Sequence, residues 1–203
     1  GYIKNWWYTE DTYWRYVPYH TQVQDNMQGD EINIIGQYDL TFRLPPVPYE
    51  GTYELRICAP QIQHFGMFQV YLGTDRLNPT PIGLPLDFRI ASSNPNIGWE
   101  PDVDDVEINR EIDKRMRNHG YMKNNKHAGR PNSGNVVTTP LRAASGDYIR
   151  MRKILWNGTM KPDEEYFVRI KSVLNNTRTC CMLDYFEIVP RSVYAGEEVE
   201  DPW

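Results

Sequence analysis

The sequence lacks the short motifs in which most catalytic chemistry is seated. It contains no glycine-rich phosphate loop, no dinucleotide-binding glycine fingerprint and no G-x-S-x-G nucleophile elbow. Its four histidines have no recognisable spacing to a nucleophile or a carboxylate. Cofactor and nucleophilic chemistry therefore have no visible site, and we expect a protein that is not an enzyme and needs no cofactor.

Cysteine is scarce as well. Cys58, Cys180 and Cys181 are an odd number and form no C-x-x-C or zinc-type Cys/His pattern. Cys58 shares its strand parity with Glu54 and Arg56, which we interpret as the outer face of the strand. Three free thiols are the simpler interpretation. A bridge from Cys58 to the 180–181 pair is the alternative, if the two strands that carry them are neighbours.

Long apolar runs and a basic charge excess are also missing. No run of about 18 apolar residues occurs, so no segment is predicted to insert into a membrane. The net charge is −5, which argues against nucleic acid as a partner. Residues 110–153 are rich in Lys and Arg and the end of the chain is acidic, and we interpret both as solvated surface.

Aromatic residues, by contrast, are abundant at 13% of the chain, as is typical of β-rich proteins and of binding surfaces built from flat rings. Polar and apolar residues alternate in short runs separated by Pro, Gly and Asn. The strands predicted on this basis lie at 37–44, 52–58, 67–72, 84–90, 148–156, 165–174 and 181–189. This pattern indicates a mostly β fold, an antiparallel sandwich or barrel.

One helix interrupts the strands, near residues 104–118. Asp104 followed by Glu107 resembles a capping box, and Ile108, Ile112 and Met116 recur at helical spacing. Gly120 fits the position just past the helix end. The helix lies in a long insertion, about 90–136, and insertions of this size often carry function.

The chain is predicted to hold one β-sandwich domain, at 28–194. Residues 1–27 form an aromatic-rich arm or linker, which either packs across the sheet or offers rings on which sugars stack. Residues 195–203 form an acidic tail.

Acidic residues cluster at Asp102, Asp104, Asp105 and Glu107, where they resemble a calcium loop only in density. Helix capping and dipole compensation account for them more simply. Glycoside hydrolysis needs two carboxylates facing each other, and the sequence offers no way to pair any two of its acids. The sequence leaves the presence of a structural calcium ion undecided, and it predicts no set of ligands for one.

Loop aromatics and amides fit sugar binding better, because rings stack on sugar faces while polar side chains bond hydroxyl groups. The residues that we single out as ligand contacts are Asn94, Trp99, Tyr121 and Trp156. Buried packing of these rings is the alternative for each of them.

Asp184 shares its strand parity with apolar residues, and a carboxylate among them is costly unless it is paired. Both parities of 181–189 carry apolar groups, so we expect a central, well-covered strand that Pro190 ends. Asp184 is then a structural polar anchor, held by an arginine, by backbone N–H groups or by a Ca²⁺ ion.

Five blocks occur in order: "QGDEINIIGQYDLTFRLPPVPYEGTYELRI", "FQVYLG", "GLPLDFRI", "MRNHGYMK" and "MLDYFEIVPRSVY". Together they resemble the C-terminal domain that follows fasciclin repeats in surface lipoproteins of gram-negative gut anaerobes. The resemblance implies a galactose-binding-like jelly roll, exported to the outer-membrane surface by a lipoprotein anchor outside this sequence. It offers no catalytic motif to carry over.

Three functions follow from the sequence. The first is a non-catalytic, carbohydrate-binding-like module in adhesion or glycan capture, with a polysaccharide as partner. The second is a structural or protein-adhesion domain that braces neighbouring fasciclin repeats. The third is a glycoside hydrolase, which would need two facing carboxylates in a cleft.

Overall fold

The fold is given by a computed structural model. It describes the backbone of residues 3–8, 13–17, 31–60, 66–90, 93–123, 129–131, 137–140, 150–174 and 180–194, and the side chains of 32–59, 66–90, 93–123, 151–174 and 181–194. The elements are β1 (Ile3–Tyr8), β2 (Tyr13–Val17), β3 (Glu31–Ile35), β4 (Tyr38–Arg43), β5 (Gly51–Pro60), β6 (Met67–Gly73), β7 (Thr80–Asp87), α1 (Val106–Asn118), β8 (Tyr121–Met122), β9 (Gly129–Pro131), β10 (Val137–Pro140), β11 (Arg150–Met160), β12 (Phe167–Ser172), β13 (Cys180–Leu183), β14 (Tyr185–Pro190) and α2 (Arg191–Tyr194).

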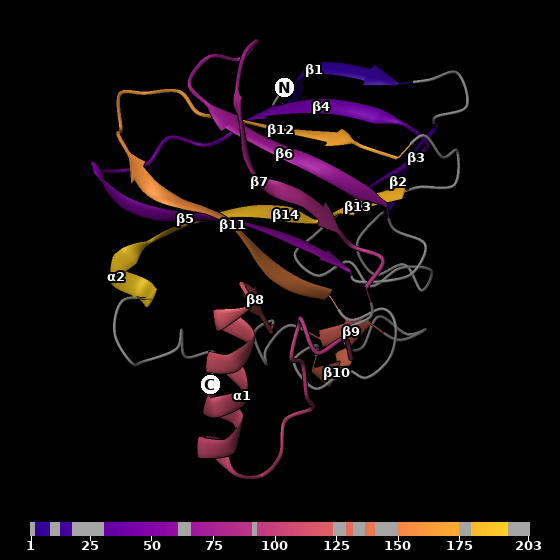
Figure 1. Ribbon diagram of the computed structural model, residues 1–203, viewed down its shortest axis with the longest axis vertical. Helices are drawn as coiled ribbons and strands as arrows, with labels where there is room; N and C mark the ends of the chain where they lie inside the picture. Colours follow the sequence, from indigo (N-terminus) through magenta and orange to yellow (C-terminus); the bar gives the residue numbers. More distant parts are fainter. Residues whose placement is uncertain are drawn as a thin grey trace.

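Two antiparallel sheets make up most of the molecule (Figure 1). The five-stranded sheet has the order β1-β4-β12-β6-β7, and the four-stranded sheet has the order β14-β5-β11-β8. Two smaller sheets, β13-β3-β2 and β10-β9, complete the described pairings, all of which are antiparallel. The expected mostly β, antiparallel fold is confirmed. The jelly-roll connectivity stays a prediction.

The main core lies between the two large sheets because each sheet turns one apolar face inward. Leu40 of β4 and Ile170 of β12 are fully buried on the five-stranded side, and Leu55 and Ile57 of β5 are fully buried on the four-stranded side. The inward-facing residues predicted from the alternation along β4, β5, β6 and β12 are confirmed as buried. Burial itself alternates strictly only in β6, because residues on the other parity of β4, β5 and β12 are in part buried as well. Burying a side chain of this kind contributes roughly 1.5–3 kcal/mol.

Helix α1 lies beside the four-stranded sheet on the side away from the main core (Figure 1). A second apolar cluster joins it to the sheet. Its buried members are Ile97, Ile112, Met116, Tyr121 and Met151. The sheet is therefore covered on both faces, which is unusual for an antiparallel sheet and shapes the chemistry of that side.

The face of β5 that carries Glu54, Arg56 and Cys58 was interpreted from the sequence as the outer face. The three residues do share one face of the strand, as predicted, but the face is not exposed, since Arg56 and Cys58 are 0% exposed. Helices α1 and α2 cover this face, and the two charged residues are paired there. Cys58 and Cys181 are both buried, and neither forms a disulfide among the described residues.

Helix α1 begins one residue later than the predicted capping pattern. Asp105, not Asp104, is the N-cap, and its carboxylate accepts the N–H groups of Glu107 and Ile108 at 2.9 and 3.3 Å. Past the helix end, Gly120 adopts a φ of 76°, which a residue with a Cβ adopts only at a cost. The helix and its glycine stop are thereby confirmed.

Residues 181–189 were expected to form one central strand, and this is wrong. The segment divides into β13, which pairs with β3, and β14, which pairs with β5. Each lies at the end of its sheet's strand order. Asp184 stands at the break between them, because the chain passes there from one sheet to another.

The predicted arm, residues 1–27, contributes β1 and β2, which pair with β4 and β3 respectively. The tail at 195–203 lies outside the described residues. The boundaries at 27 and 194 stay predictions. Of the helices that the structure describes, none has the length and apolar character needed to cross a membrane.

Candidate functional site

The face of the five-stranded sheet that points away from the main core carries polar side chains. We call Asp39, Gln69, Tyr71, Arg169 and Lys171 the polar face. They come from β4, β6 and β12, at the positions that alternate with the buried residues. Register brings them together, since Lys171 of the central strand lies opposite both Asp39 and Gln69, and Arg169 lies opposite Tyr71.

A bidentate ion pair organises this face. The Nε and Nη2 atoms of Arg169 donate to the two carboxylate oxygens of Asp39 at 2.6 and 2.5 Å. The guanidinium also stacks on Tyr71, 5.0 Å from the ring centre. The bonds to Asp39 raise the pKa of Arg169 above its usual value, so the cation is retained. A planar fork held in this way is a fixed feature of the surface.

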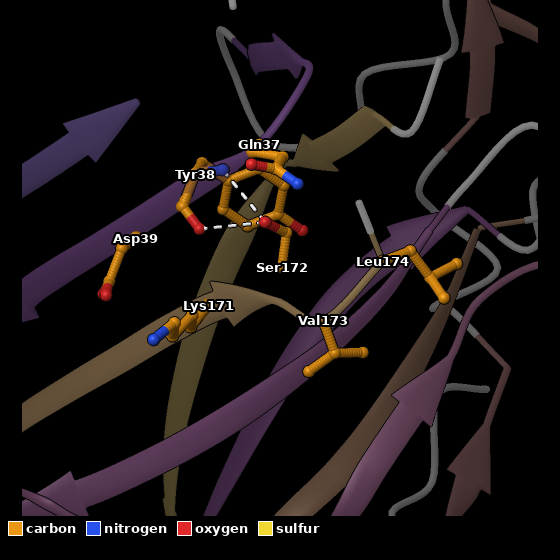
Figure 2. Close-up of a pocket in the computed structure, with 7 residues that line it drawn as sticks. All are labelled: Gln37, Tyr38, Asp39, Lys171, Ser172, Val173 and Leu174. Atoms are coloured by element: carbon orange, nitrogen blue, oxygen red, sulfur yellow. Dashed lines mark hydrogen bonds between the residues drawn. The ribbon is translucent and has the colours of Figure 1, made fainter. Parts of the chain in front are cut away.

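An open pocket of about 310 Å³ lies where β4 and β12 meet at one end of the sheet. Its lining residues are Gln37, Tyr38, Asp39, Lys171, Ser172, Val173 and Leu174. Figure 2 shows Lys171 and Asp39 at one end of the pocket and Val173 and Leu174 at the other. The pocket thus offers charge on one side and apolar groups on the other.

The pocket wall is fixed by Ser172. Its hydroxyl accepts the Tyr38 N–H at 3.0 Å and donates to the Tyr38 carbonyl at 3.2 Å (Figure 2). These bonds close the ladder between β4 and β12 at the point where the strand pairing ends. Because the Ser172 side chain is bonded to the backbone of Tyr38, this part of the pocket wall is already ordered before a ligand binds.

Two of the predicted ligand residues belong to the second apolar cluster instead. Tyr121 is 8% exposed and Trp99 is half-buried, and a lysine lies over each ring: Lys153 Nζ at 4.1 Å from the centre of Tyr121 and Lys123 Nζ at 5.8 Å from that of Trp99. Burial, with the nearby charge of Asp87, raises the pKa of Tyr121 to about 12. Both rings hold the region of α1 against the sheet.

Trp156 and Asn94 lie elsewhere. Trp156 is half-buried, packs against the main core and covers the backbone of Gly158, so closely that a Cβ on that glycine would lie 2.2 Å from the ring. The Asn94 carboxamide accepts the N–H of Asn96 at 2.9 Å and shapes its own turn. The four predicted residues therefore do not converge on one site, and their ligand role stays a prediction.

Two carboxylates meet on the covered face of the four-stranded sheet, within a cluster that we call the buried ion network: Glu54, Arg56, Arg117, Arg152 and Glu187. Glu54 bonds Arg56 at 2.7 Å and Arg117 at 2.6 Å. Glu187 lies 3.5 Å from Arg56 and 3.6 Å from Arg152. Glu54 is only 3% exposed, so this pair is not presented to a substrate and holds the helices to the sheet.

Asp184, the predicted polar anchor, is half-buried, and its backbone N–H donates to the Cys58 carbonyl at 3.4 Å. What its carboxylate bonds stays a prediction. Within the described side chains, no group of three or more His, Cys, Asp or Glu residues is arranged to hold a metal ion.

Sequence reasoning missed the polar face and its pocket. The alternation along 37–44 and 165–174 places Asp39, Arg169 and Lys171 on the outward parity, which is the signal that could have found them. The alternation does not indicate which strands are neighbours. The pairing of β4 with β12 joins residues about 130 positions apart in the sequence.

Comparison with known proteins identifies no family. No family model matches the sequence, and no curated protein matches it. Among solved structures, the chain is similar to a Paenibacillus xanthan lyase, with a TM-score of 0.47 and 13% identity over 93% of this chain and 12% of that one. The chain thus spans about an eighth of that protein's length, and a likeness this slight carries no conclusion about function.

Proposed function

We propose that this chain is a non-catalytic, carbohydrate-binding-like module of an exported cell-surface protein. The observation that carries the proposal is the pocket at the end of the polar face, in which Gln37, Lys171 and Ser172 stand beside the apolar groups of Val173 and Leu174. A sugar has the same two-sided character, with hydroxyl groups at its edges and C–H groups on its faces. Pockets that combine a few placed polar groups with apolar lining are typical ligand sites.

The site is suited to capture rather than to chemistry. The pocket is open, and Asp39, the one carboxylate among its described lining residues, is bound by two N–H donors of Arg169. A general acid or base must be able to exchange a proton with its substrate, and a carboxylate held in a bidentate pair is poorly placed to do so. The resemblance to domains that follow fasciclin repeats supports a setting at the outer-membrane surface, with a lipoprotein anchor outside this sequence.

Affinity gel electrophoresis against a panel of neutral and acidic polysaccharides tests the proposal. We expect retardation of the wild-type chain by at least one polymer. Replacing Gln37 and Val173 together by alanine should weaken that binding about fivefold to thirtyfold, because one hydrogen bond and one apolar contact are lost.

Arg43→Ala is the matched control, since Arg43 lies on β4 but pairs with the exposed Glu165 outside the pocket. It should bind like the wild type. No retardation of the folded wild type by any polymer of the panel would contradict the proposed function.

A second candidate is a structural domain that braces neighbouring fasciclin repeats. It is favoured by the packing of Trp99, Tyr121 and Trp156, whose rings hold elements together. This function predicts that the chain binds no polysaccharide and that deleting it lowers the melting temperature of the repeats to which it is joined.

A further inference from the structure

The charges at the pocket are unequal. Asp39 directs both carboxylate oxygens to Arg169, although Lys171 is its direct cross-strand neighbour. The Lys171 side chain is exposed, and its ammonium group has no hydrogen-bond or ion-pair partner among the described residues. Among the described side chains, two cations therefore face one anion at this end of the sheet, in a chain whose net charge is −5.

The position of this ammonium group is also informative. It stands at the charged end of the pocket, across from the exposed side chain of Val173 (Figure 2). Gln37 supplies a neutral amide between the two ends. A sugar ring lying on the apolar end would reach the lysine with a substituent at its edge.

This inference rests on the proposed function and names its ligand class. We propose that the pocket binds an acidic glycan, with Lys171 pairing an anionic group of the sugar and Val173 contacting the ring. The bond is charge-assisted, so it adds discrimination against neutral sugars that lack the group. Because the pair is open to solvent, its contribution is modest and falls as salt rises.

The experiment compares three gels that contain a polyuronate, a sulfated polysaccharide or a neutral galactan, at low and at physiological ionic strength. The uronate and sulfate arms distinguish a carboxylate from a sulfate as the anionic group. Retention of the wild type by an acidic polymer, weakening with salt and exceeding retention by the galactan, is the expected result.

The variants are Lys171→Gln, Lys171→Arg and the control Lys161→Gln. Both lysines are exposed. Lys161 lies between β11 and β12 and pairs with Glu164 at 3.8 Å, whereas Lys171 lies near the far end of β12. We expect Lys171→Gln to weaken binding to the acidic polymer about threefold to tenfold, Lys171→Arg to restore most of it, and Lys161→Gln to have little effect. Thermal melting should be unchanged in all three, since neither lysine is buried.

The outcomes separate this inference from the proposed function. Binding to the neutral galactan alone, or acidic binding that Lys171→Gln does not weaken, would overturn the inference and leave the function standing. An equal loss in Lys161→Gln would also overturn it, because the attraction would then be one of overall charge. Failure of the wild type to bind any of the polymers would overturn both.

Discussion

Replacing Arg56 by alanine is expected to lower the free energy of unfolding by about 3–5 kcal/mol, because breaking a buried ion pair leaves charge without compensation. Arg56 is fully buried and contacts Glu54 and Glu187, and its guanidinium lies 5.7 Å from the Tyr194 ring centre. Arg117 and Arg152 remain near the two glutamates, but each now has to balance a carboxylate that it shared before. Urea denaturation measures the loss.

Arg43→Ala again serves as the control. It removes an exposed pair, Arg43 with Glu165 at 3.1 Å, and surface pairs contribute at most about 1 kcal/mol. A loss below about 1 kcal/mol in Arg56→Ala, equal to that of the control, would mean that the buried ion network does not hold α1 and α2 against the sheet.

Gly158→Ala is expected to lower the free energy of unfolding by about 1–3 kcal/mol, because the added methyl group overpacks a site that the Trp156 ring already fills. The added Cβ would lie 2.2 Å from one atom of the Trp156 ring and 2.6 Å from another, and the ring itself packs on the main core. Trp156 has to leave its position, and the contacts beneath it are lost. Denaturation and the fluorescence maximum of the variant report both effects.

A double-mutant cycle isolates the cause. In the Trp156→Ala background the ring is absent, so Gly158→Ala should be neutral, or stabilising by a few tenths of a kcal/mol through the unfolded state. A cost that stays the same in both backgrounds would show that the glycine is needed for its backbone and not for the space that the ring occupies.

Local pattern was enough to predict β4, β5, β6, β11 and β12 and the helix α1. The alternation of 37–44 predicted that Tyr38, Leu40 and Phe42 face the core, and all three are buried. Alternation depends only on the geometry of one strand, so it predicts the buried face of that strand even when its neighbouring strands are unknown. The extent of β7 was harder, because its two prolines resemble a loop, and they are tolerated since β7 is at the end of its sheet.

What lies across a strand could not be predicted from such patterns. Glu54 and Arg56 are charged residues of the kind that usually face solvent, and the packing of α1 and α2 on that side of the sheet makes them buried. Asp184 sits in an apolar run that is continuous in sequence but crosses from β13 to β14 in space. Both errors arise because burial and sheet membership depend on tertiary packing that the local pattern does not contain.

The candidate site shows the same limit. Trp99, Tyr121 and Trp156 were chosen because aromatic rings in loops suit sugar stacking, and the same rings suit a packed cluster equally well. Asp39 and Lys171 carry no motif, and they become a candidate site only when strands from the two ends of the chain pair. Sheet register, rather than composition, is what gathers them.

Nuclear magnetic resonance titration of the ¹⁵N-labelled chain with uronate and galactan oligosaccharides tests the central claim most directly. We predict that the amide chemical shifts of residues 37–39 and 171–174, around the pocket, change on titration. Shifts that move instead around Trp99 and Tyr121, or no shifts with either oligosaccharide, would contradict a glycan-binding site at the end of the five-stranded sheet.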